Sequence, residues 1–194
     1  MSTLIASSRP VVLADLIPGG RVRDAVLVVS GAALTGLCAQ LSIHTPLSPV
    51  PFTLQTFAVL LTGAALGAHR GALGQMLYVA LGLALPFYSD GASGPDVLFG
   101  VTGGYLFGFI LAGYAVGRLA ELRQDRTFTR AFPAFCVGQL IIFGIGVPWL
   151  AISANMTPSE AIAAGFTPFI LGGILKSALA GLMLPAAWKL VGTR

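Results

Sequence analysis

Long apolar stretches separated by short polar connections dominate this chain. The stretches cover residues 25–43, 52–68, 71–88, 103–120, 131–154 and 166–191. Each has about the length that a tilted helix needs to cross a hydrocarbon core roughly 30 Å thick. The pattern therefore predicts an all-α, polytopic membrane protein, in which a bundle of six transmembrane helices forms one domain over 25–194. Residues 1–24 are predicted to be a cytoplasmic or interfacial segment.

The composition agrees with a membrane protein. Hydrophobic residues make up 56% of the chain and charged residues only 9%, and the mean hydropathy is +0.87. Such values are typical of integral membrane proteins. Cys38 and Cys136 both lie within predicted helices, which favours small buried side chains over a disulfide.

The basic residues gather on one side of the predicted membrane. Ten of the eleven lie there: Arg9, Arg21, Arg23, Arg70, Arg118, Arg123, Arg126, Arg130, Lys189 and Arg194. The connections on the other side, 44–51, 89–102 and 155–165, contain no Lys or Arg. The positive-inside rule predicts that both termini lie in the cytoplasm. The formal charge of +4 is thus a topology signal, and nucleic acid is not an expected partner.

Lys176 is the remaining basic residue, and it lies in the middle of the last apolar stretch. A lysine near the hydrocarbon core costs about 2.5 to 3.5 kcal/mol, so it normally faces a bundle interior and meets an anionic partner or a polar ligand. On a helical projection Lys176 flanks the small residues Gly173 and Ser177, which are suited to helix packing. This position indicates an inward side chain. The alternative is a lysine that snorkels to the outer interface.

Polar residues near the outer ends of the helices predict a small-molecule pocket. The candidate polar residues and glycines are Thr53, Gln55, Ser89, Asp90, Thr102, Gly103, Gly104, Tyr105, Gln139 and Lys176. Aromatic residues at the same depth are Phe52, Phe87, Tyr88, Phe99 and Phe169. A few polar groups among aromatic and apolar walls are the usual composition of a ligand site.

Each of these candidates also has a structural interpretation. The two glutamines are suited to bonding neighbouring helices, and the tyrosines to anchoring at the interface. Asp90 and Asp96 fit ordinary solvated loop acids, and Gly103 and Gly104 fit a tight turn. In the third outer connection, Thr157, Pro158 and Glu160 form a capping-box pattern, which predicts a short surface helix that ends at Gly165.

An enzyme is not indicated. His44 and His69 are predicted on opposite faces of the membrane, and no carboxylate lies at the centre of a predicted helix, so catalytic groups and metal ligands are lacking at membrane depth. We expect no cofactor and no metal site. The sequence also lacks a Gly-Lys-Ser/Thr nucleotide loop, so any coupling to ATP must come from a partner. A channel or a structural subunit is the alternative function to ligand capture.

Three segments, 49–63, 100–109 and 168–176, resemble the BioY family, the biotin-specific substrate-binding components of energy-coupling-factor (ECF) transporters. The resemblance covers nearly the whole chain from residue 25 onward. It implies a bundle that captures biotin with high affinity for uptake across the cytoplasmic membrane. It also implies partners, usually a transmembrane coupling subunit and a pair of cytoplasmic ATPases. A homo-oligomer and another small vitamin as substrate are the alternatives.

The chain departs from the family pattern in its last helix. An Asp commonly precedes the family's lysine by three residues, and this chain has Gly173 there. Lys176 is then expected to pair with the ligand or with an outer-loop acid such as Asp90, unless biotin is held by different contacts. In the first helix, Ala32 and Gly36 are the expected contact with the coupling subunit.

Overall fold

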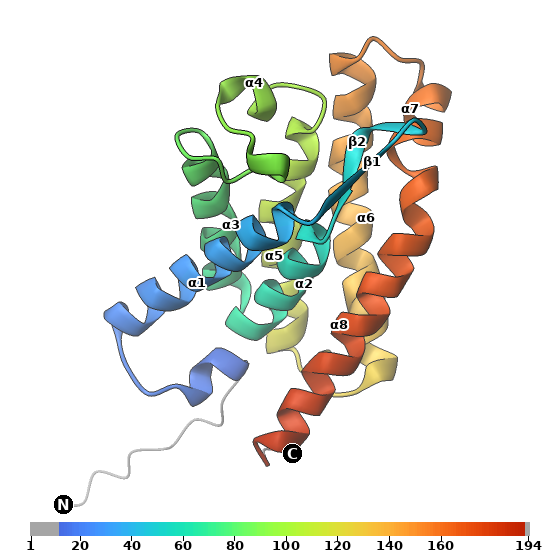
Figure 1. Ribbon diagram of the computed structural model, residues 1–194. Coiled ribbons are helices and arrows are strands. Elements are labelled where there is room, and N and C mark those ends of the chain that lie inside the picture. The colour runs from blue at the N-terminus through green and yellow to red at the C-terminus, as the bar shows by residue number, and fades with distance from the viewer. Residues whose placement is uncertain (1–11, 193–194) are drawn as a thin grey trace, which may run out of the picture.

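The computed structural model describes residues 12–192, which form a helical bundle with a small β-hairpin at one end (Figure 1). In chain order the elements are η1 (Leu13–Leu16), α1 (Arg21–Ala39), β1 (Ser42–Thr45), β2 (Ser48–Thr53), α2 (Gln55–Leu66), α3 (Ala68–Gly82), η2 (Ser89–Gly91), α4 (Pro95–Leu98), α5 (Gly103–Glu121), α6 (Phe128–Ser153), α7 (Pro158–Gly165), η3 (Thr167–Phe169) and α8 (Ile170–Leu190). The predicted N-terminal segment up to residue 11, with Arg9, lies outside the described residues, as does Arg194.

Within residues 12–192, four helical stretches are long and apolar enough to cross a membrane. They are Arg21–Ala39, Gly103–Glu121, Phe128–Ser153 and Pro158–Leu190. The second and third predicted spans are shorter than expected, because α2 has 12 residues and α3 has 15, against about 20 for a typical span. Gly67, with a φ of +86°, lies at both the end of α2 and the start of α3.

The β-hairpin is a correction to the all-α prediction. β1 and β2 pair antiparallel, with Ser42 opposite Thr53 and Ile43 opposite Phe52. The apolar run that begins at Phe52 therefore starts as a strand, and the helix follows only from Gln55. Pro49 and Pro51 favour this outcome, because the residue before a proline is pushed toward extended backbone.

The capping box in the third outer connection is confirmed. The Thr157 hydroxyl accepts a hydrogen bond from the backbone N–H of Glu160, and the Glu160 carboxylate accepts one from the backbone N–H of Thr157 at 2.8 Å. The helix α7 begins at Pro158 and ends at Gly165, as the sequence predicts.

The helix α5 packs against α2, α3 and α6. Its close approach to α2 depends on glycine, because a Cβ added to Gly63 would lie 2.8 Å from the Gly113 carbonyl oxygen. Glycine on both helices thus permits backbone contact, as is common between helices in lipid. The buried apolar residues form two clusters, one with Tyr78, Phe109 and Ile142 and the other with Leu60, Val116 and Phe135.

The small residues of α1 face the interior of this chain. Ala32 and Gly36 are both buried, and a Cβ added to Gly36 would lie 2.6 Å from the Phe87 ring. Neither residue therefore offers surface to a coupling subunit in this arrangement, contrary to the expectation. The exposed face of α1 carries Val22 and Val26 instead.

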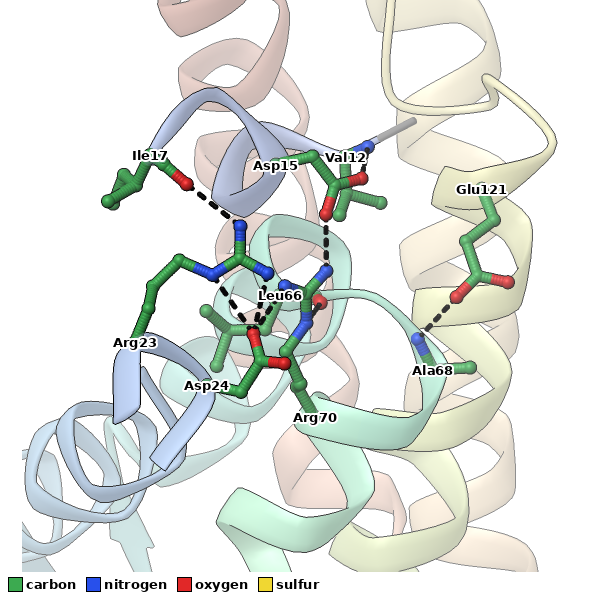
Figure 2. A network of polar contacts seen from close by, with 9 residues as sticks. All are labelled: Val12, Asp15, Ile17, Arg23, Asp24, Leu66, Ala68, Arg70 and Glu121. Carbon is green, nitrogen blue, oxygen red and sulfur yellow. Dashed lines mark hydrogen bonds and ion pairs between the residues drawn. The ribbon is translucent and has the colours of Figure 1, made fainter. Parts of the chain in front are cut away.

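A polar network lies at the end of the bundle opposite the hairpin (Figure 2). The Arg70 guanidinium lies 2.6 Å from the Asp15 carboxylate and 3.1 Å from that of Asp24. It also donates to the Leu66 carbonyl at 2.8 Å, and the Glu121 carboxylate accepts from the backbone N–H of Ala68 at 2.9 Å. The network joins η1, α1, the α2–α3 connection and α5. The first described residue, Val12, and the C-terminal end of α8 lie at this end, whereas the hairpin, α4 and α7 lie at the other (Figures 1 and 2).

Candidate ligand-binding site

A pocket lies at the hairpin end of the bundle, among β2, α2, α5, α6 and α8. It encloses about 620 Å³ of space not filled by protein atoms, with the open solvent at its mouth included. Its lining residues are Val50, Pro51, Thr53, Gln55, Thr56, Tyr88, Ser89, Val97, Thr102, Tyr105, Leu106, Phe109, Gln139, Phe143, Phe169, Gly173 and Lys176. Mostly apolar walls with a few polar groups are typical of small-molecule sites.

Lys176 reaches from α8 across the pocket to the start of α2. Its Nζ donates to the Thr53 carbonyl oxygen at 2.7 Å and to the Thr56 hydroxyl at 3.0 Å. Within residues 12–192, no carboxylate forms an ion pair with Lys176, so the expected pairing with Asp90 is absent. The ammonium also lies beside the N-terminus of α2, which carries partial positive charge. The pocket therefore presents an uncompensated positive charge, which favours a ligand with an acceptor or an anionic group.

Gln139 carries an unused acceptor in the pocket wall. Its Nε2 donates to the Gly173 carbonyl oxygen at 3.5 Å, whereas its Oε1 is buried and has no hydrogen-bond partner among the described residues. A buried acceptor without a partner costs about 1 to 3 kcal/mol. The amide lies beside Gly173, where a Cβ would be 3.7 Å from the Gln139 Cδ, an ordinary packing distance. The arrangement fits a ligand that donates a hydrogen bond.

Gln55 lines the pocket, but its polar atoms bond within the protein. Its Nε2 donates to the Tyr78 hydroxyl at 2.5 Å, and its Oε1 accepts from the Thr53 hydroxyl at 2.8 Å. The interpretation that this glutamine bonds a neighbouring helix therefore matches its contacts, since Tyr78 lies on α3. Gln55 fixes Thr53, whose carbonyl oxygen binds Lys176.

Aromatic rings form the apolar wall of the pocket. Tyr105 packs edge-to-face on Phe143 with ring centroids 6.1 Å apart, and its hydroxyl donates to the Gly165 carbonyl oxygen at 2.9 Å. Phe52 lies outside this lining; it stacks on Phe169 with centroids 4.3 Å apart and backs the wall. Direct ligand contact by Phe52 is thus a prediction that the geometry does not favour.

Three other predicted ligand residues also lie outside the lining. A Cβ on Gly103 would lie 1.9 Å from the Leu98 carbonyl oxygen, and a Cβ on Gly104 would lie 2.2 Å from the Trp149 Cβ. Both glycines therefore serve close packing around the start of α5. Asp90 points to the hairpin, where it contacts Ser42 and His44. Lys176, Gln55, Thr53, Ser89, Tyr105 and Gln139 do line the pocket.

Some lining residues were not predicted. Those on helices could have been found from their spacing relative to a predicted residue. Leu106 and Phe109 lie on the same face of α5 as Tyr105, and Phe143 follows Gln139 by one turn of α6. Val50 and Pro51 come from the unpredicted strand β2 and carried no such signal. No group of three or more His, Cys, Asp or Glu residues suited to a metal ion occurs in the described part of the chain.

Comparison with known proteins identifies relatives of this chain. A sequence model of the BioY family matches residues 7–193. The biotin transporter BioY of Thermotoga maritima is 40% identical over 142 residues, which cover 73% of this chain and 82% of that protein. The biotin transporter BioY2 of Lactococcus lactis subsp. cremoris is 36% identical over 157 residues, which cover 79% and 83%.

A solved structure shows the same fold. The 2.1 Å crystal structure of the S-component for biotin from an ECF-type ABC transporter superposes with a TM-score of 0.78 at 22% identity, covering 87% of this chain and 92% of that chain. The relatives above are named as transporters, in agreement with the prediction that the chain is not an enzyme. The family match and the apolar helices agree on a multi-pass membrane protein, and the chain belongs to the BioY family.

Proposed function

We propose that this protein captures biotin with high affinity and serves in its uptake, as the substrate-binding component of an ECF-type transporter. Two relatives are named as biotin transporters, and the fold is that of a biotin S-component. The observation that carries the proposal is the pocket itself, in which the Lys176 ammonium and the unpaired Gln139 Oε1 are set among aromatic walls.

The chemistry of biotin fits these groups. Its ureido ring offers two N–H donors and a carbonyl acceptor, and it also carries a carboxylate. We expect the Gln139 Oε1 to accept one ureido N–H, and Lys176 to make a direct or water-bridged polar contact to the ligand. The thiolane ring and valeryl chain find apolar contacts on Phe109, Phe143 and Phe169, which line the pocket.

Equilibrium binding of biotin to the purified protein in detergent tests the function. We expect selective binding of biotin, with no comparable binding of thiamine or riboflavin. Gln139→Met should weaken biotin binding about three- to tenfold, because one hydrogen bond is lost. The same change should leave the ligand-free protein equally stable or more stable, because it removes a buried unpaired acceptor.

Gln75→Met is the matched control for Gln139→Met. Gln75 is fully buried and lies outside the pocket lining, and its Nε2 donates to the Thr35 and Thr62 hydroxyls at 3.1 and 3.2 Å. Its Oε1 also has no partner among the described residues, but its replacement removes two hydrogen bonds inside the protein. Gln75→Met should therefore lower thermal stability without changing biotin affinity. Absence of biotin binding by a monodisperse wild-type protein would reject the function. Selective binding of thiamine or riboflavin would establish a different vitamin as substrate.

The transport role requires partners. The sequence has no nucleotide-binding loop, so we infer that ATP-binding cassette ATPases and a transmembrane coupling subunit supply energy to this chain. A homo-oligomer is the alternative assembly. Co-purification of the wild-type protein with such subunits distinguishes the two.

We infer that six helices cross the cytoplasmic membrane, α2 and α3 among them, and that both termini are cytoplasmic. Arg118, Arg123 and Arg130 are exposed and lie in or beside the connection between α5 and α6. This connection is at the bundle end opposite the hairpin (Figure 1), which supports this orientation. In a background with both native cysteines replaced by alanine, Ser93→Cys should react with an impermeant maleimide in intact cells, and Thr129→Cys only after lysis. The reverse labelling pattern would invert the orientation.

A further inference from the structure

Asp90 connects two separate parts of the pocket wall from the outside. Its Oδ1 accepts a hydrogen bond from the Ser42 hydroxyl, and its Oδ2 lies 3.4 Å from the His44 Nε2. Ser42 and His44 both belong to β1, 48 and 46 residues before Asp90 in the chain. We call these three residues the Asp90 latch.

The two parts that the latch joins both line the pocket. On one side, β1 is paired with β2, which contributes Val50, Pro51 and Thr53 to the lining. On the other side, Tyr88 and Ser89 immediately precede Asp90 and also line the pocket. Separation of Asp90 from β1 would therefore let these two walls move apart.

Asp90 is itself outside the lining, so it can act on the ligand only through the walls. Its backbone has a φ of +58°, a left-handed conformation that Asp and Asn adopt more readily than most residues. This conformation turns the chain between Tyr88 and Ala92, whose backbone groups are bonded at 3.0 Å. A polar contact from Gln40 to the Tyr88 carbonyl oxygen, also 3.0 Å, provides a second connection nearby.

We propose that Asp90 is a positioning residue whose latch holds the β1–β2 hairpin against residues 88–91 and slows the exchange of bound ligand. This inference rests on the proposed capture of a ligand in the pocket. The latch lies in solvent, because the side chains of His44 and Asp90 are 66% and 47% exposed. Polar contacts between exposed side chains are weak, so the latch opens without unfolding, and it affects the rates of ligand entry and release.

Asp90→Asn tests the latch, because Asn keeps the left-handed backbone and the side-chain size while it removes the charge that faces His44. We expect the dissociation rate of biotin to rise about threefold, in keeping with the loss of an exposed charged contact. The association rate should rise as well, since an open wall admits ligand faster. A direct ligand contact would instead change dissociation alone.

Two further variants test whether the effect of Asp90→Asn arises in the latch itself. Asp96→Asn, in the same outer connection, should leave both rates unchanged, because the Asp96 side chain has no hydrogen bond or ion pair among the described residues. In a protein that already carries Ser42→Ala and His44→Ala, Asp90→Asn should have no further effect. An equal effect of Asp90→Asn in both backgrounds would overturn the proposal.

Hydrogen exchange of the ligand-free protein gives a readout that does not depend on biotin. Amides of residues 42–53 should exchange faster in Asp90→Asn and in the Ser42→Ala, His44→Ala protein than in the wild type, while amides of α5 and α6 stay unchanged. Unaltered exchange in the hairpin would overturn the latch. Absence of biotin binding by the wild type would instead reject the proposed function, and exchange would still decide whether the latch exists.

Discussion

Replacement of Lys176 by Met should weaken biotin binding by about ten- to a hundredfold. The substitution keeps the long apolar part of the side chain and removes the ammonium, whose hydrogen bonds are worth about 1.5 to 3 kcal/mol each when a charged group is involved. The ammonium already contacts Thr53 and Thr56, and it retains a third N–H for a ligand. Titration calorimetry of the purified variants measures the loss.

The ligand-free Lys176→Met protein should remain folded. A lysine at membrane depth costs about 2.5 to 3.5 kcal/mol, so its removal offsets the two lost hydrogen bonds. Lys189→Met is the matched control, because Lys189 is exposed near the end of α8 opposite the pocket. Its biotin affinity should equal that of the wild type. If Lys176→Met binds biotin as tightly as the wild type, Lys176 does not contact the ligand.

Several pocket residues could be predicted because they are polar side chains on apolar helices. Lys176, Gln139 and Tyr105 each lie on a long apolar helix, where a polar side chain is costly toward lipid and is expected to face the protein. All three line the pocket. Among the described residues, Lys176 forms no ion pair, and the sequence accounts for this in part, because Gly173 stands where the family commonly has Asp.

Contacts between distant segments were not accessible from the sequence. Phe52 begins the apolar run that continues into α2, and nothing in that pattern separates a paired strand from the first turn of a helix. The requirement for Gly104 depends on Trp149, a partner on another helix. Asp90 resembles any solvated loop acid until the fold brings β1 beside it. The pocket walls are therefore predictable where they are helical, and not where they depend on the hairpin.

The glycine at position 117 allows α5 to lie directly against the α2–α3 connection, and its replacement by alanine should destabilise the protein strongly. A Cβ there would lie 2.4 Å from both the Ala68 nitrogen and the Gly67 carbonyl carbon. Both are backbone atoms that no rotamer change can move, so α5 must shift. Overpacking of this kind costs about 1 to 3 kcal/mol, occasionally more, which predicts a fall in melting temperature of roughly 2 to 12 °C.

The displacement from Gly117→Ala should also disturb the polar network at this end, because Glu121 lies one turn further along α5 and accepts the Ala68 N–H (Figure 2). Gly144→Ala in α6 is the matched control, since a Cβ there meets no atom within 4 Å and alanine favours a helix over glycine by about 1 kcal/mol. Thermal unfolding in detergent should therefore move in opposite directions for the two variants. Equal melting temperatures would mean that α5 and the α2–α3 connection lie farther apart in the bundle than these contacts require.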